Sequence, residues 1–299
     1  MEANVKTQVE YLIGVDGGGS GTRVRVETVD GLEIARGVAG PSGLMHGINQ
    51  AWSAVMDAVN AAFTEAGRAR PALQHLAIGL GLAGVHNKQW ASKFATKNPG
   101  FSALALETDA FTTLLGAHQG QPGAIIAIGT GSVGEALLPH GIRREVGGWG
   151  FPSSDEASGA WIGLRAIQHA QHSLDGRAAN TYFARAVIDF CGGDRDSLFD
   201  WLARANQTNY AQLAPVVIEH AASDAVANAI MSQAGEEIAK IAAALDPAGT
   251  VPIALCGGLA APLREFLPVA FLSRVVTAQG DAAAGALQLI RRHMKDKSC

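Results

Sequence analysis

The chain has 299 residues, of which 48% are hydrophobic and 17% charged, and its formal net charge is −4. This length suggests two domains, and this share of apolar residues excludes global disorder. The 23 basic residues are scattered rather than clustered. We therefore expect no nucleic-acid partner and no binding to an anionic membrane surface.

Neither a membrane span nor a secretory signal is predicted. Apolar runs such as Ala124–Ile128 are far shorter than the roughly 20 residues that cross a bilayer. Residues 1–19 lack a basic segment followed by a long apolar core. Cys191, Cys256 and Cys299 form no CxxC pair, so no disulfide framework or cysteine-held metal is predicted. We expect a cytoplasmic protein with reduced thiols.

The elements of the first part of the chain begin with a short apolar run, a glycine turn and an alternating strand. The patterns of alternation and helical periodicity then continue in order. They predict strands at Tyr11–Val15, Thr22–Val29 and Glu33–Val38, a helix over Ile48–Glu65, a strand at Leu76–Leu82, a helix over Trp90–Lys97, a strand at Ser102–Leu106 and a helix over Ala110–Ala117.

The pattern restarts at Gly123. A strand at Ala124–Ile128, a glycine turn, and strands at Glu135–Leu138 and Arg143–Val146 repeat the order seen at the start. A repeat at this spacing indicates two related halves rather than a solenoid. Residues 157–237 are expected to be mostly helical, followed by a strand at Val251–Leu255 and a helix over Asp281–Lys295.

We accordingly place an N-terminal domain at residues 1–117 and a C-terminal domain at residues 118–299, whose terminal helix could pack back toward the first. Exposed backbone N–H groups near glycine turns bind anions. Two such turns facing one cleft would hold one phosphate chain from both sides.

The 36 glycines are unusual against an average usage of about 7%. Many lie in clusters that follow an apolar, strand-like run, directly or closely. Glycine at such a place lets the backbone turn sharply or approach a ligand. These clusters are Gly17–Gly19, Gly129–Gly134, Gly147–Gly150 and Gly257–Gly258.

The segment Asp16–Thr22 reads DGGGSGT. A carboxylate at the end of a buried strand is costly unless it is paired or coordinates an ion. One interpretation is that Asp16 holds hydrated Mg²⁺ while the turn holds phosphate oxygens; its residues would be Gly17, Gly18, Gly19, Ser20 and Thr22. The alternative is a tight hairpin capped by Asp16, although such a hairpin does not need three glycines. The absence of a GK[ST] ending excludes a P-loop.

The second glycine segment matches GxGxxG, the dinucleotide fingerprint. A Rossmann unit needs a helix directly afterwards, whereas Pro139 and Gly141 interrupt the next segment. We interpret it as a second phosphate loop, with an ordinary glycine-rich hairpin as the alternative. Its candidate ligands are Gly129, Thr130, Gly131 and Ser132.

Three further segments could contact ligands. Gly257 and Gly258 could let an adenosine lie against the backbone, or could be a plain strand–helix junction. Asp109 could cap the helix that it precedes, or could accept the proton of a hydroxyl that attacks the γ-phosphate. In the segment 147–159, an acidic pair suits either a helix N-cap or the hydroxyls of a sugar, and an aromatic ring could pack on a sugar face. The candidates there are Gly148, Trp149, Asp155 and Glu156.

The ordered motifs DGGGSGT, ETDA, IGTGS, GGWG with SDEASG, CGGLA and GDAAAGA resemble the N-acetylglucosamine kinase and BadF/BcrA-type ATPase group, including bacterial glucosamine kinases. The resemblance covers nearly the whole chain. It implies an α/β fold of two ribonuclease H-like, actin-like ATPase domains around a central cleft. It also implies an ATP- and Mg²⁺-dependent hexosamine kinase that closes on its substrates.

By this resemblance the product is phosphorylated at the 6-hydroxyl of glucosamine or N-acetylglucosamine. Asp109 matches the catalytic base, Asp155 a sugar ligand and Asp16 the support of Mg²⁺. The group often has GPSN where this chain has Gly40–Gly43, so an asparagine is missing or shifted, and Ser42 remains a candidate sugar contact. It often has GDEGS where this chain has SDEAS. These departures leave the acceptor sugar open.

The rival class is a non-sugar ATPase of the same group, either an activator or a regulator. Activators of radical dehydratases hold an iron–sulfur cluster through cysteines, and none of the three cysteines lies in a comparable position. A regulator should lack the base, whereas Asp109 is present, and we expect no DNA-binding segment before Tyr11. A homodimer is left open.

Overall fold

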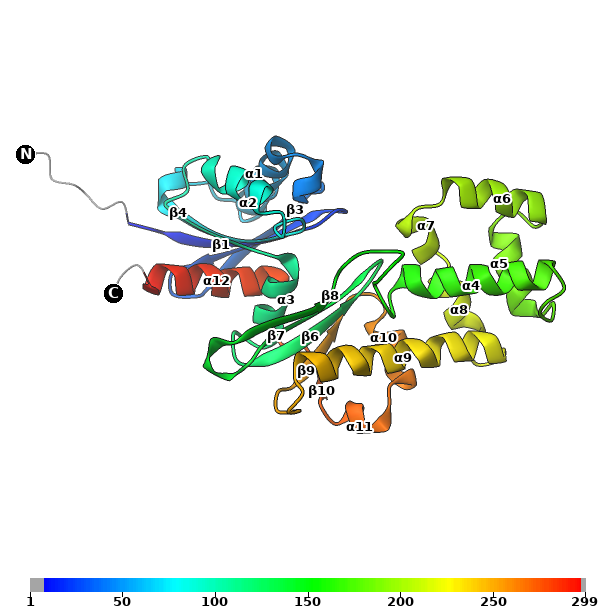
Figure 1. Cartoon of the computed structure of the whole chain (residues 1–299). Helices are drawn as coiled ribbons and strands as arrows, with labels where there is room; N and C mark the ends of the chain where they lie inside the picture. Colours follow the sequence, from blue (N-terminus) through cyan, green and yellow to red (C-terminus); the bar gives the residue numbers. More distant parts are fainter. Residues whose placement is uncertain (1–7, 297–299) are drawn as a thin grey trace, which may run out of the picture. The chain divides into compact units, whose positions relative to one another are not determined.

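The computed structural model describes residues 8–296, which form two compact units (Figure 1). The first unit contains the described residues up to Gln121 and those from Ala278 onward, and the second contains Pro122–Thr277. The sequence placed the boundary slightly earlier, after residue 117, and counted residues 278–299 with the second domain. The terminal helix joins the first unit because it packs on strands of that unit.

The first unit is a five-stranded sheet with helices on both faces (Figure 1). The strand order is β3-β2-β1-β4-β5. Strands β1, β4 and β5 run parallel to one another, and the neighbouring pairs β1–β2 and β2–β3 are antiparallel. The elements are β1 (Tyr11–Gly17), β2 (Thr22–Thr28), β3 (Glu33–Ala39), α1 (Ile48–Glu65), β4 (Leu76–Leu82), α2 (Lys88–Thr96), β5 (Ala103–Glu107), α3 (Asp109–Ala117) and α12 (Ala282–Asp296), with 3-10 turns at Leu44–His46 and Leu73–His75.

Helix α12 lies directly on the first sheet. It packs against β1, β4 and α3, while α1 covers the opposite face over β2 and β3. A Cβ at Gly14 would overlap the backbone of Ala283, and one at Gly79 would overlap the backbone of Ala286. Small residues on both surfaces therefore let the helix approach the strands closely.

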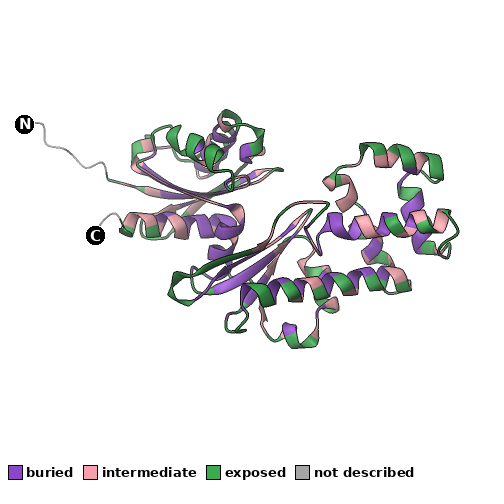
Figure 2. Cartoon of the chain, viewed as in Figure 1, coloured by how far each residue is buried: buried purple, intermediate pink, exposed green. Residues whose placement is uncertain are grey.

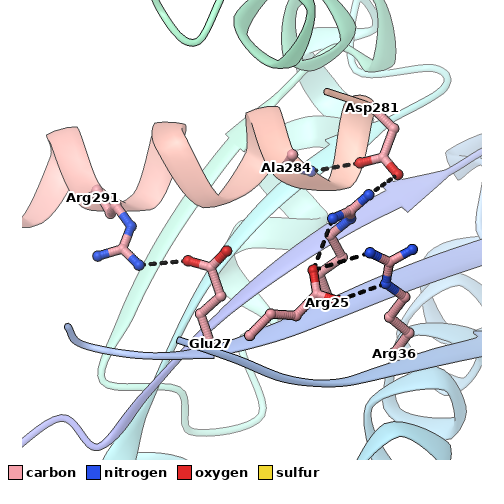
Figure 3. Close-up of polar contacts among 7 residues, drawn as sticks. Arg25, Glu27, Arg36, Asp281, Ala284 and Arg291 are labelled. Carbon is pink, nitrogen blue, oxygen red and sulfur yellow. Dashed lines mark hydrogen bonds and ion pairs between the residues drawn. The ribbon is translucent and has the colours of Figure 1, made fainter. Parts of the chain in front are cut away.

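Ion pairs also tie α12 to β2 (Figure 3). Arg25 on β2 donates to Asp281 at 2.7 Å and to Glu33 at 2.8 Å. Further along the helix, Arg291 donates to Glu27 at 2.5 Å. The pairs with Asp281 and Arg291 join residues more than 250 positions apart in the chain.

The second unit repeats the first sheet. Its strand order, read from β8, is β8-β7-β6-β9-β10, with β6–β7 and β7–β8 antiparallel and β6–β9 parallel. This matching order confirms the predicted internal repeat. The elements are β6 (Gly123–Ile128), β7 (Ser132–Leu137), β8 (Arg143–Gly147), α4 (Gly159–Leu174), α5 (Tyr182–Phe190), α6 (Arg195–Arg204), α7 (Gln207–Ala211), α8 (Ala214–His220), α9 (Ala225–Leu245), β9 (Ile253–Cys256), α10 (Ala260–Leu263), α11 (Val269–Leu272) and β10 (Val275–Val276), with 3-10 turns at Pro139–Gly141 and Arg264–Phe266.

The core of the second unit lies between its sheet and its helices. Helix α9 packs on β6, β7 and β8, and α4 packs against α5, α7, α8 and α9. Figure 2 shows the buried faces of α4 and α9 and the buried strands of the sheet. The sequence located the strands β6 to β9 within a few residues, but it missed the two-residue β10 and the short helices α10 and α11, which are too brief to show periodicity.

Within residues 8–296, no helix has the length and apolar character that crossing a membrane requires.

Candidate functional site

The first glycine turn connects β1 to β2. The strands close on the pair Gly17–Thr22, and Asp16 is paired across the ladder with Arg23. The Asp16 side chain is 23% exposed, and one of its oxygens lies 3.4 Å from an Arg23 nitrogen. A pocket of about 270 Å³ opens at this turn. Its lining includes Asp16, Gly18, Ser20, Gly21, Thr22 and Arg23.

The segment Gly40–Gly43 braces this turn from behind. The backbone N–H groups of Ser42 and Gly43 both donate to the carbonyl of Gly18. Thr22 Oγ1 lies 2.7 Å from the Gly40 carbonyl and 2.7 Å from Ser42 Oγ. Thr22 and Ser42 are buried. Their hydroxyls therefore shape the turn, whereas Gly19 and Ser20 are exposed at its tip.

Asp109 lies at the same edge of the sheet as Asp16. Asp16 is near the carboxyl end of β1, and Asp109 follows the carboxyl end of β5, which is parallel to β1 through β4. The N-cap of α3 is Thr108, whose side chain accepts from the N–H of Phe111. The alternative role of Asp109 as the helix cap is therefore taken by its neighbour.

The environments of these two carboxyls change their proton affinity. Burial raises the pKa of Asp109, opposed by N–H groups of its own helix start and by the charge of His86. Burial also raises the pKa of Asp16, opposed by Arg23, while the charges of Asp109 and Asp281 raise it further. The negative charge of Asp109 therefore acts on Asp16 and favours its protonated form.

The second glycine turn connects β6 to β7 and closes on the pair Ile128–Ser132. Thr130 is exposed at its tip, whereas Ser132 is buried and donates from Oγ to the carbonyl of Glu156 at 2.6 Å. The backbone N–H of Gly159 donates to the carbonyl of Gly129. The segment that follows β8 thus braces this turn, as Gly40–Gly43 braces the first.

The acidic pair behind this turn occupies two different settings. Asp155 is 4% exposed, and burial raises its pKa although Ser132 and Gln207 donate to it. Glu156 is half-buried and accepts from Ser154 Oγ at 3.1 Å. The N-cap of α4 is Ser158, so neither acid is the cap.

Trp149 is 86% exposed in the glycine segment after β8, where Gly148 has a φ of 71°. Trp149 and Glu156 line a second pocket of about 270 Å³, together with Lys240 on α9. The structure thus brings these two predicted sugar contacts to one concave surface of the second unit.

Gly257 and Gly258 lie beside the second turn because β9 is the parallel neighbour of β6. Gly257 has a φ of 92°, and a Cβ there would overlap the carbonyl of Ile128. Only glycine fits this position. Gly258 is exposed, so its backbone is open to a ligand.

Sequence reasoning missed three side chains that act on the candidate residues. They are Arg23 beside Asp16, His86 whose charge acts on Asp109, and Gln207, which donates to Asp155. Arg23 follows the motif directly and could have been noted from the sequence. His86 and Gln207 carry no local signal, because each reaches its partner only through tertiary packing.

No cluster of three or more His, Cys, Asp or Glu side chains suited to a metal occurs among the residues from 8 to 296. Cys191 and Cys256 are free thiols, and burial raises the pKa of each to about 11. These thiols are therefore inert at neutral pH. A single carboxylate such as Asp16 still suits Mg²⁺, which is commonly bound by one or two carboxylates and substrate phosphates.

The fold and the paired glycine turns define an actin-like ATPase, a class that includes sugar kinases. A model of the BadF/BadG/BcrA/BcrD ATPase family matches residues 13–288, and the chain belongs to this family. The glucosamine kinase GspK of Vibrio cholerae is 34% identical over 280 residues, covering 93% of this chain and 95% of that protein.

Solved structures agree with this fold. A Chromobacterium violaceum protein assigned as an N-acetylglucosamine kinase is 53% identical, with a TM-score of 0.90 over 94% of this chain and 99% of its own. A ROK-family glucokinase from Streptomyces griseus is 17% identical with a TM-score of 0.53, over 94% of this chain and 98% of its own, and shares the fold alone.

Proposed function

We propose that this chain is an ATP-dependent amino-sugar kinase that transfers the γ-phosphate of ATP to the 6-hydroxyl of glucosamine or N-acetylglucosamine. The proposal is supported by the relatives named as glucosamine and N-acetylglucosamine kinases, which match almost the full length of the chain. The observation that carries it is Asp109, a partly buried carboxylate that begins α3 without being its N-cap and lies at the same sheet edge as Asp16.

Asp109 is proposed as the general base. A base must be ionised to accept the hydroxyl proton, and a pKa closer to neutrality makes it a better proton acceptor. Burial supplies that shift here, and the charge of His86 limits it. The proton would move from the sugar hydroxyl to a carboxylate oxygen of Asp109 as the hydroxyl oxygen bonds to phosphorus and ADP leaves.

The phosphates of ATP are proposed to contact backbone N–H groups at the tips of both glycine turns and the exposed hydroxyls of Ser20 and Thr130. The buried hydroxyls of Thr22 and Ser132 would shape those turns from within. Gly257 and Gly258 would accept the adenosine against their backbone.

Asp16 is proposed to hold Mg²⁺ through its hydration shell. Its burial and the neighbouring charge of Asp109 both raise its pKa, and a cation would offset both effects. When bound, Mg²⁺ neutralises charge on the transferring phosphoryl group.

The second unit is proposed to bind the sugar through Trp149, Gly148 and Glu156, with Asp155 close behind. Trp149 is exposed in a glycine segment and suits the apolar face of a pyranose ring. Ser42 is fully buried against Thr22, so its proposed contribution to sugar binding is indirect, through the shape of the first turn.

The test is ADP release from Mg²⁺-ATP with glucosamine, N-acetylglucosamine, glucose or no acceptor, followed by NMR assignment of the phosphorylated oxygen. We expect ADP release to depend on an amino sugar and the phosphate to appear on O6. The matched control is the 6-deoxy form of the preferred sugar, which should give no product. Equal ADP release without any acceptor would remove the kinase proposal, and phosphate on another oxygen would remove the 6-hydroxyl assignment.

A further inference from the structure

Gln207, the first residue of α7, reaches back to the second glycine turn. Its Nε2 donates to Asp155 Oδ2 at 2.6 Å, across 52 positions of the chain. Both side chains lie beside Gly131 in the turn. A Cβ at Gly131 would lie 2.8 Å from Asp155 Oδ2 and 3.1 Å from Gln207 Nε2. The turn is thus in direct contact with this side-chain pair.

The backbone of Asp155 needs such support. Its φ is 64°, in the left-handed region that residues other than glycine adopt at a cost in energy. Its side chain is buried and also accepts from backbone N–H groups of Ser132 and Gly150. A buried carboxylate that loses a donor must move, take up a proton or stay under-solvated. Movement of the carboxylate would also take the acceptor away from the N–H of Ser132 in the turn.

The position of Gln207 is fixed by the packing of its helix. Asn206 caps α7, and Asn209 completes a capping box. Tyr210 contacts the ring of Phe151 with centroids 5.1 Å apart. Helix α7 also crosses α4 so closely that a Cβ at Gly163 would overlap the carbonyl of Tyr210. The amide is therefore held in place before any ligand arrives.

We propose that Gln207 is a positioning residue for nucleotide binding: its amide holds Asp155 against Gly131 and thereby fixes the second glycine turn in the shape that receives ATP phosphate. The proposal rests on the function proposed above for that turn. Asp155 thereby supports the binding of ATP phosphate, and it also lies close to the proposed sugar contacts.

Gln207→Met keeps the length of the side chain and removes the donor. Gln207→Glu keeps the shape and places a second carboxyl beside Asp155. Two adjacent carboxyls share a proton at low pH and repel at high pH. The Glu variant should therefore restore the contact in acid, when one carboxyl donates to the other, and lose it in base.

The experiment measures the binding of a non-hydrolysable ATP analogue with Mg²⁺ by calorimetry, at pH 5.5 and pH 8. Each variant is expressed as a ratio to the wild-type affinity at the same pH, which cancels the titration of the analogue. Gln212→Glu is the matched control, because Gln212 is exposed at the end of the same helix. Thermal melting of each variant checks that it is folded.

We expect Gln207→Met to weaken binding about tenfold or more at both pH values, as expected for the loss of a hydrogen bond to a charged group. Gln207→Glu should be weaker than wild type at pH 8 and recover most of the affinity at pH 5.5, and Gln212→Glu should match wild type. A pH-dependent ratio is not expected if Gln207 only supports the fold.

Wild-type affinity in both Gln207 variants at pH 8 would overturn the inference, as would a loss in Gln207→Glu that is equal at both pH values. If Gln207→Met does not fold, the two pH values of Gln207→Glu decide the question. The acceptor is absent from this measurement, so a wild type that binds the analogue but phosphorylates no amino sugar rejects the proposed acceptor alone. A wild type that does not bind the analogue rejects both proposals.

Discussion

The two glycine turns occupy the same place in their sheets and differ in their electrostatics. Each closes an antiparallel pair at the centre of its sheet, and each is braced from behind by a following segment. The ladder pair next to the closing pair is Asp16 with Arg23 in the first turn, and Ala127 with Val133 in the second. The first turn therefore carries charge where the second carries apolar side chains.

This difference indicates a division of labour between repeated halves. In the first unit, Asp16 lines the turn and the charges of Asp109 and Asp281 act on it, which suits a site for a cation and a proton acceptor. Beside the second turn, the buried carboxyl of Asp155 accepts hydrogen bonds from within the unit. At the exposed tip of that turn, Thr130 supplies a neutral hydroxyl beside the backbone N–H groups.

Asp109→Asn should have the largest effect, because it removes the proposed base from the first unit. Loss of general-base catalysis lowers turnover by about 10²- to 10⁴-fold. Turnover is measured with saturating ATP and amino sugar, beside Asp57→Asn, an exposed helix position, as the control. Near-full turnover in folded Asp109→Asn would show that another group accepts the proton.

The same substitution should raise stability at neutral pH. Burial raises the pKa of Asp109, so the folded state holds this proton more tightly than the unfolded state does. Stability from this group therefore falls as pH rises from the unfolded pKa through the folded pKa. Asparagine removes that cost at pH 7 and should raise the Tm, with a difference from wild type that vanishes in acid. A Tm at or below wild type at pH 7 would contradict the assigned environment.

Asp16→Asn tests whether the cation binds at the first glycine turn. We expect the Mg²⁺ concentration for half-maximal turnover to rise about tenfold or more, the effect of removing a charged ligand group. Asp30→Asn, an exposed position in the turn between β2 and β3, is the control. An unchanged Mg²⁺ dependence would place the cation elsewhere and weaken the contrast between the turns.

Gly257→Ala should destabilise the second unit by about 2 kcal/mol, because it combines a strained backbone with overlap on a carbonyl. Gly258→Ala is the matched neighbour, since a Cβ there would meet no heavy atom of residues 8–296 within 4 Å. Urea unfolding of both variants gives the comparison. Equal stabilities of the two variants would contradict the close approach of Gly257 to the carbonyl of Ile128.

The smallest effect is expected from the two serines whose hydroxyls support the turns, and removing either hydroxyl should lower stability by a similar amount. Ser42→Ala and Ser132→Ala each remove one buried hydroxyl contact behind a turn and should cost about 1 kcal/mol. Ser20→Ala, at the exposed tip of the first turn, should leave stability unchanged. A large loss in only one of the two buried variants would show that the turns are braced differently.

The sequence by itself determined the two glycine turns and the strands that flank them. Alternation, apolar runs and glycine placement are local signals, and the paired orders of β1–β5 and β6–β10 bear them out. The position of Asp109 shortly after β5 was also visible, because a carboxylate between a strand and a helix is a local feature.

Tertiary structure decided which of those residues face inward. Thr22 and Ser132 were predicted as phosphate ligands, yet each hydroxyl contacts a segment 18 to 24 positions away. Gln207 acts on a turn more than 70 positions earlier, and the terminal helix joins the first unit through small residues that fit against strand glycines. Such contacts depend on how helices pack on a sheet, and local periodicity records only that a face is apolar or small, with no information on what it will meet.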